Sequence, residues 1–128
     1  MKIGVPKEIK NNECRVGLTP DSVKLLSSNH KIYVEKNAGK AIGFTDEMYQ
    51  ANGAEILKEA SSVFEESELI VKVKEPLPEE NQFLSPKHTL FTYLHLAGNK
   101  ENAKKLIDTG VKGVAYETVT SNDGSLPL

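Results

Sequence analysis

Short runs of β-branched and aromatic residues alternate along the chain with segments that carry helix-capping residues. The runs are KIGV at 2–5, KIYVE at 31–35, ELIVKV at 68–73, TLFTYL at 89–94 and GVAYE at 113–117. Strands that alternate with helices are typical of βαβ units, in which the strands are parallel. The pattern predicts one α/β domain over residues 1–128, with a flavodoxin-like or Rossmann-like doubly wound, mainly parallel sheet and helices on both faces.

Capping residues mark the helices between these runs. Three helices are predicted to begin after Thr19, Thr45 and Asn99, and Gly53 and Gly110 can close the second and third. Weaker signals indicate a helix within EASSVFEES at 59–67 and a single turn within PLPEENQFLSP at 76–86. The final residues, SNDGSLPL, predict a turn followed by apolar residues, so the tail is either a crossing segment or the start of a further element.

Composition narrows the possible partners. With 38% hydrophobic and 27% charged residues, the 128-residue chain fits one globular domain with a core. A net charge of −2 offers no basic surface for nucleic acid, and no segment approaches the roughly 18 apolar residues of a membrane span. The single cysteine, Cys14, forms no disulfide within the chain, and no Cys/His spacing indicates a metal site. Since the N-terminus shows no signal-peptide pattern, we expect a cytoplasmic protein that binds neither nucleic acid nor membrane.

Three side chains that could bind a ligand or act in catalysis are expected at one edge of the sheet. Arg15, the only arginine among sixteen basic residues, lies in the loop after the first strand; Lys74 and His95 follow two later strands. In doubly wound sheets, ligands bind outside the carboxyl ends of the strands. An arginine fork can hold a carboxylate, a lysine can polarise a carbonyl, and a histidine can transfer a proton. This combination fits a 2-oxo acid.

Each of the three residues also has a structural interpretation. Arg15 could form an ordinary surface ion pair, and His95 could be a core histidine bonded to a carbonyl. Lys72 and Lys74 share a strand face and could both discourage pairing at a sheet edge. The other two histidines, His30 and His88, are expected to be solvated.

Phosphate-binding motifs are missing from the sequence. It contains no GxGxxG, no GxG and no GxxxxGK[ST], so no dinucleotide cradle is predicted in this chain. A phosphorylation receiver is disfavoured as well, because it needs acidic strand ends for Mg²⁺ and the first and third strands here end in PKEIKN and KVKEP.

The motifs MKIGVPKEIKNNECRVGLTPDSV, VEKNAG, VKVKEP, LFTYLHLA and VAYETV resemble the N-terminal portion of alanine dehydrogenases, in the same order and over essentially the whole chain. The transhydrogenase α chain is similar at the opening but lacks the combination of KVKEP and YLHLA. The resemblance implies interconversion of L-alanine with pyruvate and ammonia using NAD, and a homo-oligomeric full-length enzyme.

Specific roles follow from the same resemblance. Arg15 corresponds to the substrate-carboxylate anchor, Lys74 to a second substrate contact with a catalytic role, and His95 to the acid/base group on the substrate oxygen. Tyr93 is expected to line the pocket. The resemblance also implies that NAD binds to a domain outside these 128 residues, so the chain alone is expected to be inactive. The alternatives are a stand-alone binding module for small 2-oxo acids, a transhydrogenase α-chain-like domain and a truncated domain.

Overall fold

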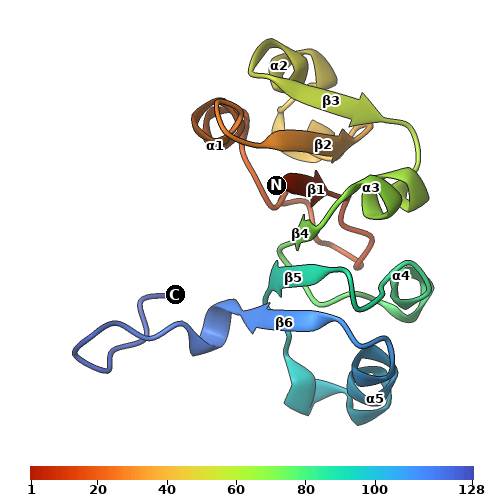
Figure 1. Ribbon diagram of the computed structural model, residues 1–128, viewed down its shortest axis with the longest axis vertical. Coiled ribbons are helices and arrows are strands. Elements are labelled where there is room, and N and C mark those ends of the chain that lie inside the picture. Colours follow the sequence, from red (N-terminus) through yellow and green to blue (C-terminus); the bar gives the residue numbers. More distant parts are fainter.

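The computed structural model describes residues 1–128, which form a six-stranded sheet with helices on both faces (Figure 1). The strands are β1 (Lys2–Val5), β2 (Lys31–Glu35), β3 (Ala54–Leu57), β4 (Leu69–Val71), β5 (Thr89–Thr92) and β6 (Lys112–Ala115). The α-helices are α1 (Pro20–Leu26), α2 (Asp46–Ala51), α3 (Ala60–Glu66), α4 (Pro78–Asn81) and α5 (Lys100–Asp108). Three 3₁₀ turns are η1 (Lys40–Ile42), η2 (Leu96–Gly98) and η3 (Tyr116–Thr118).

The strand order is β3-β2-β1-β4-β5-β6, and every neighbouring pair is parallel. The α/β prediction is therefore confirmed, and of the two related topologies it is the Rossmann order that the chain adopts. All five predicted strands are present, although β4, β5 and β6 each end two residues earlier than expected. The sixth strand, β3, was not predicted, because its sequence AEIL contains alanine and glutamate, which are uncommon in strands.

The predicted helix caps are confirmed. The side chains of Thr19, Thr45 and Asn99 each accept a hydrogen bond from a backbone N–H in the first turn of α1, α2 and α5. Gly53 and Gly110 follow α2 and α5 with φ of 97° and 72°, a left-handed conformation in which a Cβ would be strained.

Two hydrophobic clusters lie on opposite faces of the sheet. One joins α1 and α2 to the central strands and includes Val23, Tyr49 and Val71. The other joins α3 and α5 to β4 and β5 and includes Phe64, Ile70 and Leu106. Since Ile70 and Val71 are adjacent in β4, the two clusters show that this strand is buried on both faces.

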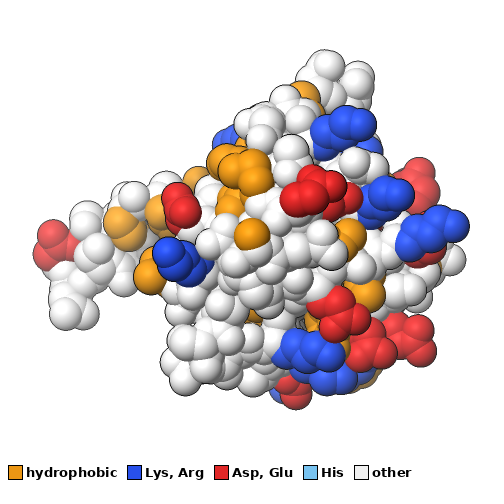
Figure 2. Space-filling model, turned by 90° about the horizontal axis from the view of Figure 1, so that it is seen from above, with side chains coloured by type: hydrophobic (Ala, Val, Ile, Leu, Met, Phe, Trp, Pro, Cys, Tyr) orange, Lys and Arg blue, Asp and Glu red, His pale blue; other side chains and the backbone are white.

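The surface carries charges of both signs. On the face shown in Figure 2, basic and acidic side chains are interspersed, without a broad area of either sign. No helix of the structure has the length and apolar character needed to cross a membrane.

Candidate active site

The strand order reverses between β1 and β4, so the loops that follow these two strands leave the same edge of the sheet side by side. The loop after β1 spans residues 6–19 and carries Arg15, and the segment after β4 carries Lys74. Gly17 lies so close to β4 that an added Cβ would be 2.4 Å from the carbonyl oxygen of Val71. The absent side chain thus allows the Arg15 loop to lie directly against the end of β4.

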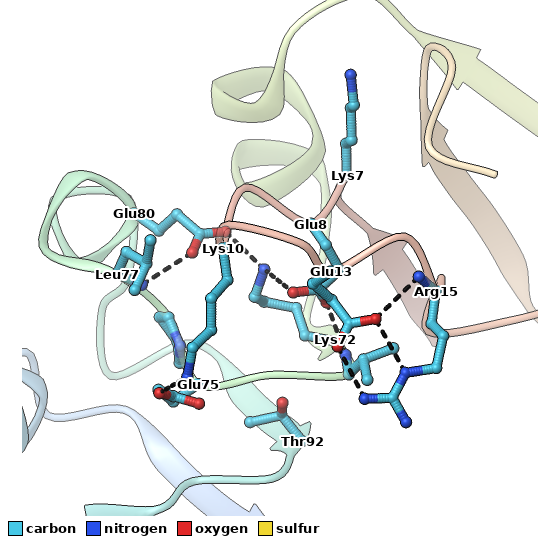
Figure 3. A network of polar contacts seen from close by, with 12 residues as sticks. Lys7, Glu8, Lys10, Glu13, Arg15, Lys72, Glu75, Leu77, Glu80 and Thr92 are labelled. Carbon is cyan, nitrogen blue, oxygen red and sulfur yellow. Dashed lines mark hydrogen bonds and ion pairs between the residues drawn. The ribbon is translucent and has the colours of Figure 1, made fainter. Parts of the chain in front are cut away.

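A buried ion cluster joins the segments at this edge (Figure 3). Nζ of Lys72 lies 2.7 Å from Oε1 of Glu80 and 3.3 Å from Oε2 of Glu8. The three side chains are only 0%, 4% and 2% exposed, respectively. Glu8 also accepts the Val73 N–H at 2.7 Å, and Glu80 accepts the Leu77 N–H at 2.9 Å. The cluster therefore ties the loop after β1, the end of β4 and α4 together.

The interpretation of Lys72 as an edge lysine was wrong, because β4 lies between β1 and β5 in the interior of the sheet.

Two carboxylates surround one ammonium group, so the cluster is not neutral when all three groups are ionised. Burial raises the pKa of Glu8, while the charge of Lys72 and its hydrogen bonds oppose this shift. The sequence offered no signal for the cluster, because Glu8 and Lys72 lie 64 residues apart.

Arg15 presents its guanidinium to a carboxylate of its own chain. Its Nε donates to Oε1 of Glu13 at 2.9 Å and its Nη2 donates to Oε2 at 2.8 Å (Figure 3). These hydrogen bonds from Arg15 lower the pKa of Glu13 to about 2, against a smaller opposing effect of burial. The Arg15 side chain remains 59% exposed. The position therefore holds a carboxylate through two parallel bonds, as an arginine fork favours.

Lys74 and Tyr93 lie beside this pair. Nζ of Lys74 is 5.9 Å from the centre of the Tyr93 ring, and the charge of Lys74 also lowers the pKa of Glu13. Tyr93 packs edge-on against Tyr116, with ring centres 5.0 Å apart. An open hollow of about 500 Å³ is lined by Arg15, Tyr93 and Tyr116 together with apolar residues such as Val73. Arg15, Lys74 and Tyr93 are thus neighbours at the predicted edge.

His95 lies at the same edge but outside this hollow. It follows β5, is exposed, and adopts φ 47° and ψ 41°, the left-handed region that residues with a side chain rarely enter. It lines a separate cavity of about 150 Å³ with Lys10, Glu75 and Asn102. The structure therefore brings Arg15, Lys74 and Tyr93 together and leaves His95 apart from them.

Glu117 was missed in the sequence, although it lies within the VAYETV motif. Its carboxylate accepts the backbone N–H of His95 at 2.8 Å, and that of Leu94 at 3.1 Å and 3.3 Å to its two oxygens. Burial raises its pKa, but these backbone hydrogen bonds outweigh burial and the net pKa is lowered. Glu117 is therefore held as a carboxylate against the backbone of His95.

The expectation that His88 is solvated was wrong. The residue is 1% exposed, with Nε2 2.8 Å from the carbonyl oxygen of Phe64 and Nδ1 accepting the Ser85 N–H at 3.0 Å. Both ring nitrogens are used within the fold, so His88 has a structural role.

The edge does not resemble a nucleotide cradle or a metal centre. In Rossmann dinucleotide sites, a short glycine-rich turn leads from β1 directly into a helix whose N-terminus faces the pyrophosphate. Here the loop between β1 and α1 is long, and the buried Glu8 carboxylate lies within it. These residues do not fit a dinucleotide. No group of three or more His, Cys, Asp and Glu side chains is arranged to hold a metal ion.

Comparison with known proteins covers the whole chain. The family described as "Alanine dehydrogenase/PNT, N-terminal domain" matches residues 4–128. Alanine dehydrogenases of Methanococcus maripaludis and Bacillus subtilis are 53% and 52% identical over 129 aligned positions, which cover 100% of this chain and 35% and 34% of those proteins. The chain thus spans about a third of the length of the relatives that it matches.

Solved structures give the same picture. An L-alanine dehydrogenase superposes with a TM-score of 0.94 at 46% identity, over 99% of this chain and 35% of that chain. A transhydrogenase from Sinorhizobium meliloti superposes with a TM-score of 0.84 at 25% identity, over 91% of this chain and 35% of that chain.

Proposed function

Because the chain belongs to the alanine dehydrogenase/PNT N-terminal domain family, we propose that it supplies the half of an alanine dehydrogenase that binds L-alanine or pyruvate. Identity near 50% to alanine dehydrogenases, against 25% to the transhydrogenase, favours the first branch of the family. The KVKEP and YLHLA motifs, which carry Lys74 and His95, favour the same branch.

The observation that carries this proposal is the two-pronged contact between Arg15 and the carboxylate of Glu13. A substrate carboxylate needs the same fork, and the 59% exposure of the Arg15 side chain supports its access to such a ligand. Lys74 and Tyr93 lie next to it. A small 2-oxo acid is therefore the ligand class that these groups suit best.

We assign the following roles. Arg15 binds the carboxylate of alanine or pyruvate, and Lys74 donates a hydrogen bond to the carboxylate and polarises the neighbouring carbonyl oxygen. Tyr93 forms a wall of the pocket. His95 takes the proton of the hydroxyl group when the carbinolamine collapses to pyruvate and ammonia, and returns it in the reverse direction. This role requires the His95 ring to reach the substrate oxygen, which calls for a rotation of the His95 side chain.

NAD, which the resemblance implies, is assigned to residues outside this chain, because the edge of this sheet does not fit a dinucleotide. The complete enzyme is proposed to be a cytoplasmic homo-oligomer. A stand-alone binding module for small 2-oxo acids is the second candidate, and the absence of a nucleotide cradle in these 128 residues favours it over an enzyme complete in itself.

The test is an NMR titration of the isotope-labelled chain with pyruvate, with Arg15→Lys as the matched variant. We expect saturable shifts of the Arg15 side-chain Nε–H and of the Lys74 and Tyr93 amides. The two amide shifts should be lost in the variant, because lysine keeps the charge without the fork. Acetate, which has the carboxylate but no 2-oxo group, is expected to bind more weakly. Absence of saturable shifts in the unmodified chain, or equal shifts in Arg15→Lys, would overturn the proposal.

A further inference from the structure

The backbone of His95 is held by a carboxylate that lies 22 residues further along the chain. Glu117, in η3, accepts the N–H groups of both Leu94 and His95. These two donors follow the end of β5, where the sheet no longer supplies acceptors for them. Glu117 thus takes the place of a neighbouring strand at the point where the chain turns.

The turn itself is unusual. His95 adopts a left-handed backbone conformation, and its carbonyl oxygen accepts the Gly98 N–H at 3.0 Å. A residue with a Cβ keeps this conformation only when its surroundings determine it. The N–H groups of Leu94 and His95 donate charge-assisted hydrogen bonds to Glu117, which lies elsewhere in the chain.

The imidazole ring packs against a different residue, Gly98. It lies against Gly98 so closely that an added Cβ would be 2.5 Å from both Cδ2 and Nε2 of His95. The backbone of His95 thus donates to Glu117, and its ring packs closely on Gly98, where the lack of a side chain leaves room for it. Neither contact occupies the hollow beside Arg15.

We propose that Glu117 is the positioning residue for His95: it fixes the backbone turn from which the imidazole is presented at the carboxyl edge of the sheet. The inference rests on the proposed function in its assignment of proton transfer to His95. Glu117 itself touches no substrate in this scheme and acts through the His95 backbone.

The first measurement is independent of any ligand. In the labelled 128-residue chain, Glu117→Gln removes the charge and one of the two strong acceptors while keeping the shape of the side chain. We expect amide hydrogen exchange of Leu94 and His95 to accelerate by about tenfold or more, as expected for loss of a charge-assisted bond. The His95 ring ¹H–¹³C resonances should also move. Glu101→Gln, which alters an exposed carboxylate paired only with Lys105, should leave both unchanged.

The second measurement uses pyruvate as the probe. In Glu117→Gln, the pyruvate-induced shift of the His95 ring is expected to fall by at least half, whereas the shift of the Arg15 Nε–H persists. A merely structural role would change both together. If pyruvate shifts nothing in the unmodified chain, the proposed function fails, while the exchange and ring measurements still decide the role of Glu117.

Gly98→Ala provides a second variant in case Glu117→Gln unfolds. It should displace the ring resonances of His95 while the amides of Leu94 and His95 stay protected, because the Glu117 contacts remain. Glu117→Gln with exchange and ring resonances within twofold of the unmodified chain would overturn the proposal. Accelerated exchange throughout the sheet in Glu117→Gln would also overturn it, because Glu117 would then stabilise the fold in general. Loss of protection at the Leu94 and His95 amides in Gly98→Ala would overturn it as well.

Discussion

The Glu13 carboxylate occupies the Arg15 guanidinium, with Nε–Oε1 and Nη2–Oε2 distances of 2.9 Å and 2.8 Å. The same two nitrogens are those that a substrate carboxylate would use in a two-pronged contact. Glu13 is therefore an internal competitor at the proposed anchor, and a bound 2-oxo acid must displace it or share the guanidinium with it.

Replacing Glu13 by glutamine should tighten pyruvate binding. A solvent-screened ion pair contributes about 0.2–1 kcal/mol, so removing the competitor should lower Kd by roughly 1.4-fold to fivefold. The NMR titration measures this change, with Glu101→Gln as the control. Weaker binding in Glu13→Gln would contradict the prediction and show that Glu13 holds Arg15 in its binding orientation.

Removing Lys72 should be far more damaging to stability than removing an exposed lysine. Lys72→Met leaves the carboxylates of Glu8 and Glu80 buried without their cation, which typically costs about 3–5 kcal/mol. Lys105→Met removes a lysine whose ion pair with Glu101 is exposed and should cost less than about 1 kcal/mol. Urea denaturation of both variants compares the two free energies of unfolding, and equal losses would be inconsistent with a buried cluster that stabilises the fold.

Gly17→Ala should move the Arg15 loop away from β4. The new Cβ would overlap the Val71 carbonyl, and the backbone atom there cannot rotate out of the way. Overpacking of this kind costs about 1–3 kcal/mol. We also expect pyruvate binding to weaken, because Arg15 lies two residues before the displaced position. Unchanged stability and unchanged affinity would mean that the loop is not held against β4 in solution.

The pair between Glu13 and Arg15 should contribute to stability only above acidic pH. The pKa of Glu13 falls from 4.5 to about 2 on folding, so the folded state binds its proton more weakly than the unfolded state. The contribution is full above pH 4.5 and disappears as pH falls toward 2. Because the Arg15 side chain is 59% exposed and solvent screens its charge, the contribution amounts to no more than about 1 kcal/mol. Urea unfolding of Arg15→Gln and the unmodified chain should therefore differ at pH 6 and converge toward pH 2.

The 128-residue chain should not reduce NAD with L-alanine. Hydride transfer requires both reactants to be held in contact, and this sheet edge has no cradle for a dinucleotide. The absorbance of NADH should remain at the level of a buffer blank. The matched control is a full-length alanine dehydrogenase of one of the relatives, assayed under the same conditions. Turnover by the short chain above the blank would refute the assignment of the nucleotide site to other residues.

Local features of this fold were predictable from sequence, and long-range ones were not. The caps at Thr19, Thr45 and Asn99 depend on residues within one helical turn, so their sequence signal is sufficient. The strand ends likewise brought Arg15 and Lys74 to one edge. The family motifs added a role for His95, whose ring nevertheless lies outside the hollow beside Arg15.

The errors share a physical cause. Lys72 lies between two valines and His88 between two polar residues, and both are charged or polar themselves, yet tertiary partners make them two of the most completely buried side chains. Glu117 accepts from a backbone turn 22 residues away, and a contact over that separation cannot be predicted from the periodicity of the sequence. Burial of a polar group is determined by its partners, and those partners lie on other elements.

The pairing of β1 with β4 brings together Ile3 and Leu69, with α1, β2, α2, β3 and α3 between them in the chain. Contacts between residues so distant in sequence form slowly, because a long loop must close before they stabilise the fold. The loop that carries Arg15 follows β1, and Lys74 follows β4, so the two residues lie on either side of this strand pair. We therefore expect folding to complete the proposed substrate anchor in a late step, when the two halves of the sheet join.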